Sequence, residues 1–222
     1  NSASGAALAS GNFTTTSTTG SAVINSLTAN TNYDVYVVTQ DDEGTPNVQA
    51  AVTLVNLTTL TGNSDGDLVA SGTVTEPVGL DTTVDTVGEA VDVFDFTFSD
   101  GGTSDGLPMT ISQVVLNVGG TSSDAIRDQI TWRLNGNDAS NVTGVYNGAS
   151  DTITFSGLSI SIADNTSETY TVNAYYNDNS GLSEDMTIIL STDGDTDITV
   201  GSTGTQMGAT SAVTNGSGTT VD

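Results

Sequence analysis

The stretch VFDFTF, residues 93–98, decides the fold, because phenylalanine occupies every second position in it. Successive side chains of a β-strand point to opposite faces, so this alternation predicts a strand with one aromatic face. The same period of two recurs in residues 33–38, YDVYVV, and in residues 170–176, YTVNAYY. Weaker alternation predicts further strands near 6–16, 21–28, 48–59, 67–75, 109–118, 129–134, 142–147, 151–156, 158–163 and 185–191.

Clusters of Gly, Asn and Asp separate these segments at the spacing of an all-β sandwich. The one helical candidate is SSDAIRD, residues 122–128, which has a serine at its start and an acidic first turn. We expect one or two helical turns there, within a loop. The fold class predicted from these patterns is therefore all-β.

The charge balance is extreme: 27 acidic residues face only Arg127 and Arg133, with no lysine or histidine, and the net charge is −25. Binding of nucleic acid or of an anionic membrane requires clusters of Lys and Arg, which this sequence lacks. Calcium, which is bound by carboxylate and carbonyl oxygens, is the natural counter-ion. The absence of cysteine excludes disulfides and thiolate metal sites, and we expect no insertion into a membrane, since no apolar run is long enough to span one.

The segment LTANTNYDVYV, residues 27–37, resembles the E-to-F corner of fibronectin type III and related immunoglobulin-like repeats. The family pattern is Leu-x-Pro-x-Thr-x-Tyr-x-Val-x-Val, and Ala29 stands where proline is usual. The resemblance covers residues 6–60 and implies a sandwich in which the Tyr33 hydroxyl bonds back to the corner. A generic strand after a polar turn is the alternative.

A second, weaker resemblance is found in IADNTSETYTV, residues 162–172. It implies a larger immunoglobulin-like sandwich, similar to repeats of large secreted bacterial adhesins and fibre proteins. The expected organisation is tandem immunoglobulin-like β-sandwiches. Its parts are the C-terminal part of a first sandwich (1–60), an acidic junction (61–67), the second sandwich (68–200) and a Gly/Ser/Thr-rich tail or start of a next element (201–222).

The first sandwich appears incomplete on its N-terminal side, because the resemblance assigns 6–16 and 21–28 to strands C′ and E. Either the chain is a slice of a longer protein, or a neighbouring subunit supplies strands A, B and C along an unpaired edge. Both alternatives imply a repetitive object assembled end to end.

The resemblance also implies where acidic loops meet. It places the B–C loop at 100–105 and the F–G loop at 177–185 on the side of the second sandwich that faces the junction. One or two calcium ions would then be bound by six aspartates: Asp65, Asp67, Asp100, Asp105, Asp178 and Asp185. A solvated acidic seam is the alternative.

Another acidic cluster is STDGDTDITV, residues 191–200, in which Asp193, Asp195 and Asp197 occupy alternate positions. At the opposite end of the sandwich these side chains could join Asp164 and Asn165 around a second calcium. The spacing resembles the start of a calcium loop, although the glutamate that closes an EF-hand is absent. The alternative is a turn whose aspartates bond the local backbone.

Few residues indicate chemistry. Trp132 shares a face with Ile130 and Leu134, which predicts core packing, with a sugar-stacking platform as the alternative. Both arginines are expected to pair with nearby carboxylates. Because the chain has no histidine, cysteine or lysine to act as base or nucleophile, we expect it not to be an enzyme.

These observations together predict an extracellular structural protein, a segment of a calcium-stiffened surface filament or stalk. Its expected partners are copies of itself or adjacent repeats of the same chain. The alternatives are an adhesin or carbohydrate-binding module that binds a glycan or a cell-surface receptor, and a surface-layer subunit.

Overall fold

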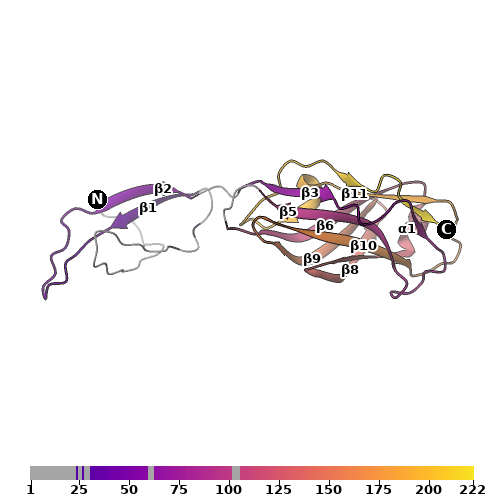
Figure 1. The fold of residues 1–222 in the computed structure, drawn as a ribbon, viewed down its shortest axis with the longest axis horizontal. Coiled ribbons are helices and arrows are strands. Elements are labelled where there is room, and N and C mark those ends of the chain that lie inside the picture. The colour runs from indigo at the N-terminus through magenta and orange to yellow at the C-terminus, as the bar shows by residue number, and fades with distance from the viewer. Residues whose placement is uncertain (1–23, 25–26, 28–30, 60–62, 102–105) are drawn as a thin grey trace. The chain divides into compact units, whose positions relative to one another are not determined.

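The chain divides into two compact units, Asn1–Gly62 (unit 1) and Asn63–Asp222 (unit 2). The computed structural model describes residues 24, 27, 31–59, 63–101 and 106–222 (Figure 1). The boundary between the units falls inside the expected junction, 61–67. The strands expected at 6–16 and 21–28, and with them the tyrosine corner of the first resemblance, lie largely outside the described residues.

Unit 1 contains a two-stranded antiparallel sheet of β1 (Asn32–Val37) and β2 (Thr53–Thr58). The register places Val35 opposite Val55 and Tyr33 opposite Leu57 on one face. Strand β1 alternates between half-buried and exposed residues, as the sequence predicts. The hairpin is therefore amphipathic, with one face rich in apolar side chains.

Unit 2 is nearly all β, which confirms the predicted fold class. Its hydrogen-bonded path runs β3-β5-β10-β7-β8-β9-β6-β11-β14-β4, with β12 on β6 and β13 on β11, and the sheet curls so that its inward face encloses a core (Figure 1). The strands are β3 (Gly66–Ala70), β4 (Val78–Leu80), β5 (Val91–Asp100), β6 (Met109–Gly119), β7 (Ile130–Gly136), β8 (Ala139–Asn147), β9 (Thr152–Ile162), β10 (Thr166–Tyr176), β11 (Thr187–Thr192), β12 (Ile198–Val200), β13 (Val213–Thr214) and β14 (Thr219–Val221).

The aromatic face of β5 forms the centre of the core. The ring centroid of Phe96 lies 5.2 Å from that of Phe98 and 6.4 Å from that of Tyr170, and all three side chains are fully buried. The first pair is edge-on and the second is stacked, and such aromatic pairs stabilise a core beyond their area burial. Trp132 is also buried, at 1% exposure, so its predicted core role is confirmed and the sugar-stacking alternative is wrong.

Two short helices lie between strands: α1 (Asp124–Asp128), where the sequence predicts it, and α2 (Gly194–Asp197), which it does not. Ser123 is the N-cap residue of α1, but its side chain makes no capping hydrogen bond. No helix in the part of the chain that the structure describes is both long and apolar enough to cross a membrane.

The largest difference from the expected organisation concerns the end of the chain. The segment expected as a tail or the start of a next element, 201–222, belongs to unit 2, because β13 and β14 both pair with β11. The two strands expected at 151–156 and 158–163 are the single strand β9, since Gly157, at φ +69°, absorbs a bulge against β6. The sequence therefore overestimates the number of long strands and misses the short ones.

Candidate functional site

A buried carboxylate lies at the end of β5, where strands β3 and β10 flank it. Asp100 is opposite Gly66 of β3 and Thr166 of β10, and its side chain has no exposed surface. Neither carboxylate oxygen makes a close hydrogen bond, although the Thr205 hydroxyl and the Met109 N–H lie near enough to lower the pKa of Asp100. The nearby Thr205 hydroxyl donates instead to the carbonyl oxygen of Leu107, at 3.3 Å.

Other oxygen-bearing side chains gather around Asp100. The main chain of Asp65 accepts a hydrogen bond from the N–H of Gly101 at 3.4 Å, and its carboxylate accepts one from the Asn63 amide at 3.0 Å. From the β9–β10 turn, the Asp164 carboxylate accepts a hydrogen bond from the N–H of Gly106 at 2.8 Å. Three separate segments of unit 2 therefore bring acidic or amide groups to one end of β5. We call Asn63, Asp65 and Asp100 the β5-end cluster.

The electrostatics of the β5-end cluster are unfavourable for a bare anion. Burial raises the pKa of the Asp100 carboxyl above its ordinary value. The Thr205 hydroxyl and the Met109 N–H offset part of this rise, and the negative charges of Asp65 and Asp164 add to it. No cationic side chain neutralises this negative charge, because the chain has only two arginines and both contact other residues.

The two arginines have different partners. Arg127 is buried and binds the Asp151 carboxylate at 2.6 Å and the Ser122 hydroxyl at 3.0 Å, as predicted for a carboxylate pair. Arg133 instead lies over the ring of Tyr175, 5.6 Å from its centroid, and donates to the Tyr175 hydroxyl at 3.4 Å. The expectation that Arg133 pairs with a carboxylate is therefore wrong for the residues that the structure describes.

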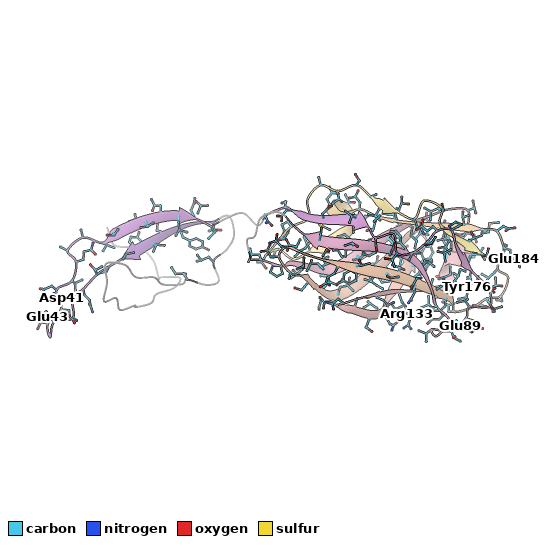
Figure 2. The ribbon with its side chains drawn as sticks, in the orientation of Figure 1. Asp41, Glu43, Glu89, Arg133, Tyr176 and Glu184 are labelled. Carbon is cyan, nitrogen blue, oxygen red and sulfur yellow. The ribbon has the colours of Figure 1, made fainter. Side chains whose placement is uncertain are left out.

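The expected six-aspartate calcium site is not assembled as predicted. Strands β5 and β10 are antiparallel neighbours, so the end of β5 lies beside the start of β10 and not beside its end. The 11 residues of β10 span roughly 33 Å, and Asp178 and Asp185 follow the far end. Figure 2 labels Tyr176 and Glu184 together at that end of unit 2.

The other members of the six-aspartate site separate as well. Asp67 is exposed, and its carboxylate accepts a hydrogen bond from the N–H of Leu68. Asp105 lies outside the described residues. Asp65 and Asp100 are the members that the structure brings together, and within the described ranges no three acidic side chains are arranged to hold a metal ion by themselves.

The aspartates of 191–200 do not join Asp164 and Asn165. The Asp197 carboxylate accepts a hydrogen bond from the Asn117 amide at 2.7 Å, and Asn117 lies eight residues along β6 from Met109, roughly 26 Å. Met109 pairs with Ile162, close to the β9–β10 turn. The predicted second calcium site is therefore wrong in its composition.

The aspartates of 191–200 bond the local chain instead. Asp193 is the N-cap of α2, and its carboxylate accepts hydrogen bonds from the N–H of Asp195 and from the Thr210 hydroxyl, the latter at 2.9 Å. The N–H of Asp193 donates to the Asp197 carboxylate at 2.9 Å. A hydrogen bond from the Asp195 carboxyl lowers the pKa of Asp193, and the same contact raises that of Asp195.

The six-aspartate prediction omits two residues near Asp100. Asn63 lies in the oxygen-rich junction but outside the six, and the sequence prediction places Asp164 at the opposite end of the sandwich. The alternation of β5 contained a usable signal, because Asp100 continues the series Phe94, Phe96, Phe98 and so falls on the core face. A carboxylate at a core-facing position is a candidate for a special role.

Comparison with known proteins gives little. No family model and no curated protein matches the chain. A solved structure described as "AvmM Catalyzes Macrocyclization in Alchivemycin A Biosynthesis" is similar over 69% of this chain and 87% of its own, with 13% identity and a TM-score of 0.34. Because that description names a catalyst, the finding contradicts the expectation that the chain is not an enzyme, and we withdraw that expectation. A likeness this small assigns no activity to the chain.

Proposed function

We propose that the chain is a structural segment of an extracellular filament or stalk, built from tandem immunoglobulin-like sandwiches that assemble end to end. The observation that carries the proposal is the apolar face of the unit 1 hairpin. On this face Val55 is 47% exposed and Leu57 is 37% exposed, although both lie in a sheet. In unit 2, by contrast, the four phenylalanines, Trp132, Tyr170 and Tyr176 are buried, and Tyr146 and Tyr175 are half-buried.

An amphipathic hairpin requires additional cover. A two-stranded sheet is marginally stable in water unless further strands or another layer bury its apolar face. Within the described residues, β1 and β2 pair with each other, and strand addition along an edge is a common way in which a partner completes such a sheet. We assign this role to unit 1 of a neighbouring copy, which would complete the sheet and link successive chains.

The composition supports an exposed, extended setting. With 27 acidic and two basic residues, copies repel one another except where a specific apolar contact overcomes the repulsion. A fibre built through one apolar face per chain is consistent with this balance, because non-specific clustering is suppressed.

The test is the variant Val55→Asp, which places a charge on the apolar face of β2. We expect polymers of the full chain, seen by electron microscopy and light scattering, to require at least about a tenfold higher protein concentration. The matched control is Asn56→Asp, which adds the same charge to the same strand on the opposite face. A wild-type chain that stays monomeric at all concentrations would overturn the proposal, as would equal effects of the two variants.

A surface fibre must resist proteolysis, and the fold predicts resistance to trypsin. Arg127 is buried, and Arg133 lies in the middle of β7 with its side chain packed on Tyr175. We expect the folded chain to be cut roughly 100-fold more slowly than the urea-unfolded chain, because cleavage requires opening. Digestion followed by mass spectrometry measures this, with Val87→Arg in the exposed 81–90 loop as a positive control that should be cut rapidly.

A further inference from the structure

We infer that the β5-end cluster, Asn63, Asp65 and Asp100, is a calcium site that neutralises the buried Asp100 carboxylate of unit 2. This inference is independent of the proposed filament role. It concerns one end of a single unit, and it would hold equally for an isolated molecule.

The buried Asp100 carboxylate is costly to the folded state when it is charged. A buried charge without a partner is among the most destabilising features that a core can contain, and proteins pair such charges or coordinate them to metals. Asp100 has no exposed surface, and neither of its oxygens makes a close hydrogen bond. Its inward direction follows from the period of β5, in which it continues the face of Phe96 and Phe98.

This chain cannot supply a cation to pair with the Asp100 carboxylate. It has no lysine and no histidine. Arg127 is bound to Asp151. Arg133 of β7 is bound to Tyr175 of β10, away from the Asp100 strand β5. Two further carboxylates, those of Asp65 and Asp164, add negative potential at Asp100. The neutralising group must therefore come from solution, as a metal ion or a proton.

The ligand types around Asp100 favour calcium over other metal ions. The available ligands are the carboxylates of Asp100 and Asp65, the amide oxygen of Asn63 and main-chain carbonyls of the segments that meet there. Calcium takes six to eight oxygens of these types in flexible geometry, whereas zinc prefers nitrogen and sulfur ligands. Magnesium dehydrates reluctantly and fits poorly beside a fully buried carboxylate.

The local backbone is held in place for such a role. The Asn63 carbonyl accepts a hydrogen bond from the N–H of Gln206 at 2.9 Å, and the N–H of Gly66 donates to the Gln206 carbonyl at 3.1 Å. The backbone on either side of Asp65 is therefore positioned by pairing with a segment far along the chain. A preorganised oxygen set loses less entropy when it binds an ion.

The experiment measures calcium-dependent stability of the full chain by calorimetry, at constant ionic strength, in chelator, in calcium and in magnesium. We expect calcium at 100-fold excess over Kd to raise the Tm of unit 2 by roughly 5 to 10 °C, and magnesium at the same concentration to raise it much less. Titration calorimetry should report one such site, whose heat is absent in Asp100→Asn.

Three variants make the assignment specific. Asp100→Asn should abolish the calcium-dependent shift and should melt higher than wild type in chelator, because the buried charge is gone. Asp65→Asn, at a half-buried position, should weaken calcium binding at least about tenfold without preventing folding. Asp92→Asn, an exposed site on the same strand, removes the same charge and should leave the shift unchanged.

The inference fails on any of four results. Equal Tm in calcium and chelator would mean that a proton neutralises Asp100. A full calcium shift in Asp100→Asn would place the ion elsewhere. If Asp92→Asn lost as much of the calcium-dependent Tm shift as Asp100→Asn, calcium would only be screening the net charge. The same conclusion would follow if magnesium raised the Tm as much as calcium.

Discussion

Replacing Phe96 with alanine is expected to lower the free energy of unfolding of unit 2 by about 3–5 kcal/mol. The ring is fully buried and contacts the rings of Phe94, Phe98 and Tyr170, so truncation leaves a cavity that β-strands on both sides cannot collapse to fill. The corresponding fall in Tm is roughly 6 to 20 °C for a unit of this size.

Urea unfolding followed by Trp132 fluorescence measures the effect of the Phe96 variant. Trp132 is the only tryptophan of the chain and is buried in unit 2, so its emission reports that unit alone. Val69→Ala, on the exposed side of β3, is the control and should change stability by no more than about 0.5 kcal/mol. A loss below about 1 kcal/mol in Phe96→Ala would show that this cluster is not the centre of the core.

Replacing Arg127 with methionine is expected to cost about 2–3 kcal/mol, the second-largest effect that we anticipate from a single side chain. Methionine retains the apolar stem of the arginine but removes its bonds to Asp151 and Ser122. Because Asp151 is partly exposed and can be rehydrated, the loss is smaller than for a fully buried ion pair.

A double-mutant cycle that combines Arg127→Met with Asp151→Asn isolates the interaction free energy of this ion pair. We expect a coupling free energy above about 1 kcal/mol between positions 127 and 151, measured by urea unfolding. Asp124→Asn provides the comparison, because Asp124 lies 3.8 Å from the guanidinium and should couple weakly. Coupling that is no larger with Asp151 than with Asp124 would contradict the geometry.

The sequence predicts the fold well where a strand is long and alternates. The β5 series and the burial of Trp132 are examples, because both depend only on which face a side chain occupies. It fails for β13 and β14, which have two and three residues and thus too few to show a period. It also misses the burial of Asp95, whose carboxylate accepts hydrogen bonds from the N–H groups of Thr73 and Val74 in a covering loop.

The sequence predicts part of the candidate site, because it groups Asp65 with Asp100 correctly but adds Asp178 and Asp185 wrongly. Asp65 and Asp100 meet because β3 and β5 are hairpin-like antiparallel neighbours that are close in sequence. The error for Asp178 and Asp185 is one of strand direction, because the resemblance implied that β5 and β10 end on the same side. Periodicity fixes the face of a residue and not the direction of its strand relative to others, so the pairing of β5 with β10 is visible only in the structure.

The parallel pairing of β14 with β4 has a consequence for synthesis. The strand at Val78–Leu80 acquires its partner only when Thr219–Val221 emerges, and the buried Asn215 amide bonds the Val93 carbonyl 122 residues away. A ribosome must therefore release residues 78–221 before this edge of unit 2 can close. Such distant pairings slow folding, so a nascent chain is expected to keep β4 unpaired for most of the synthesis of unit 2.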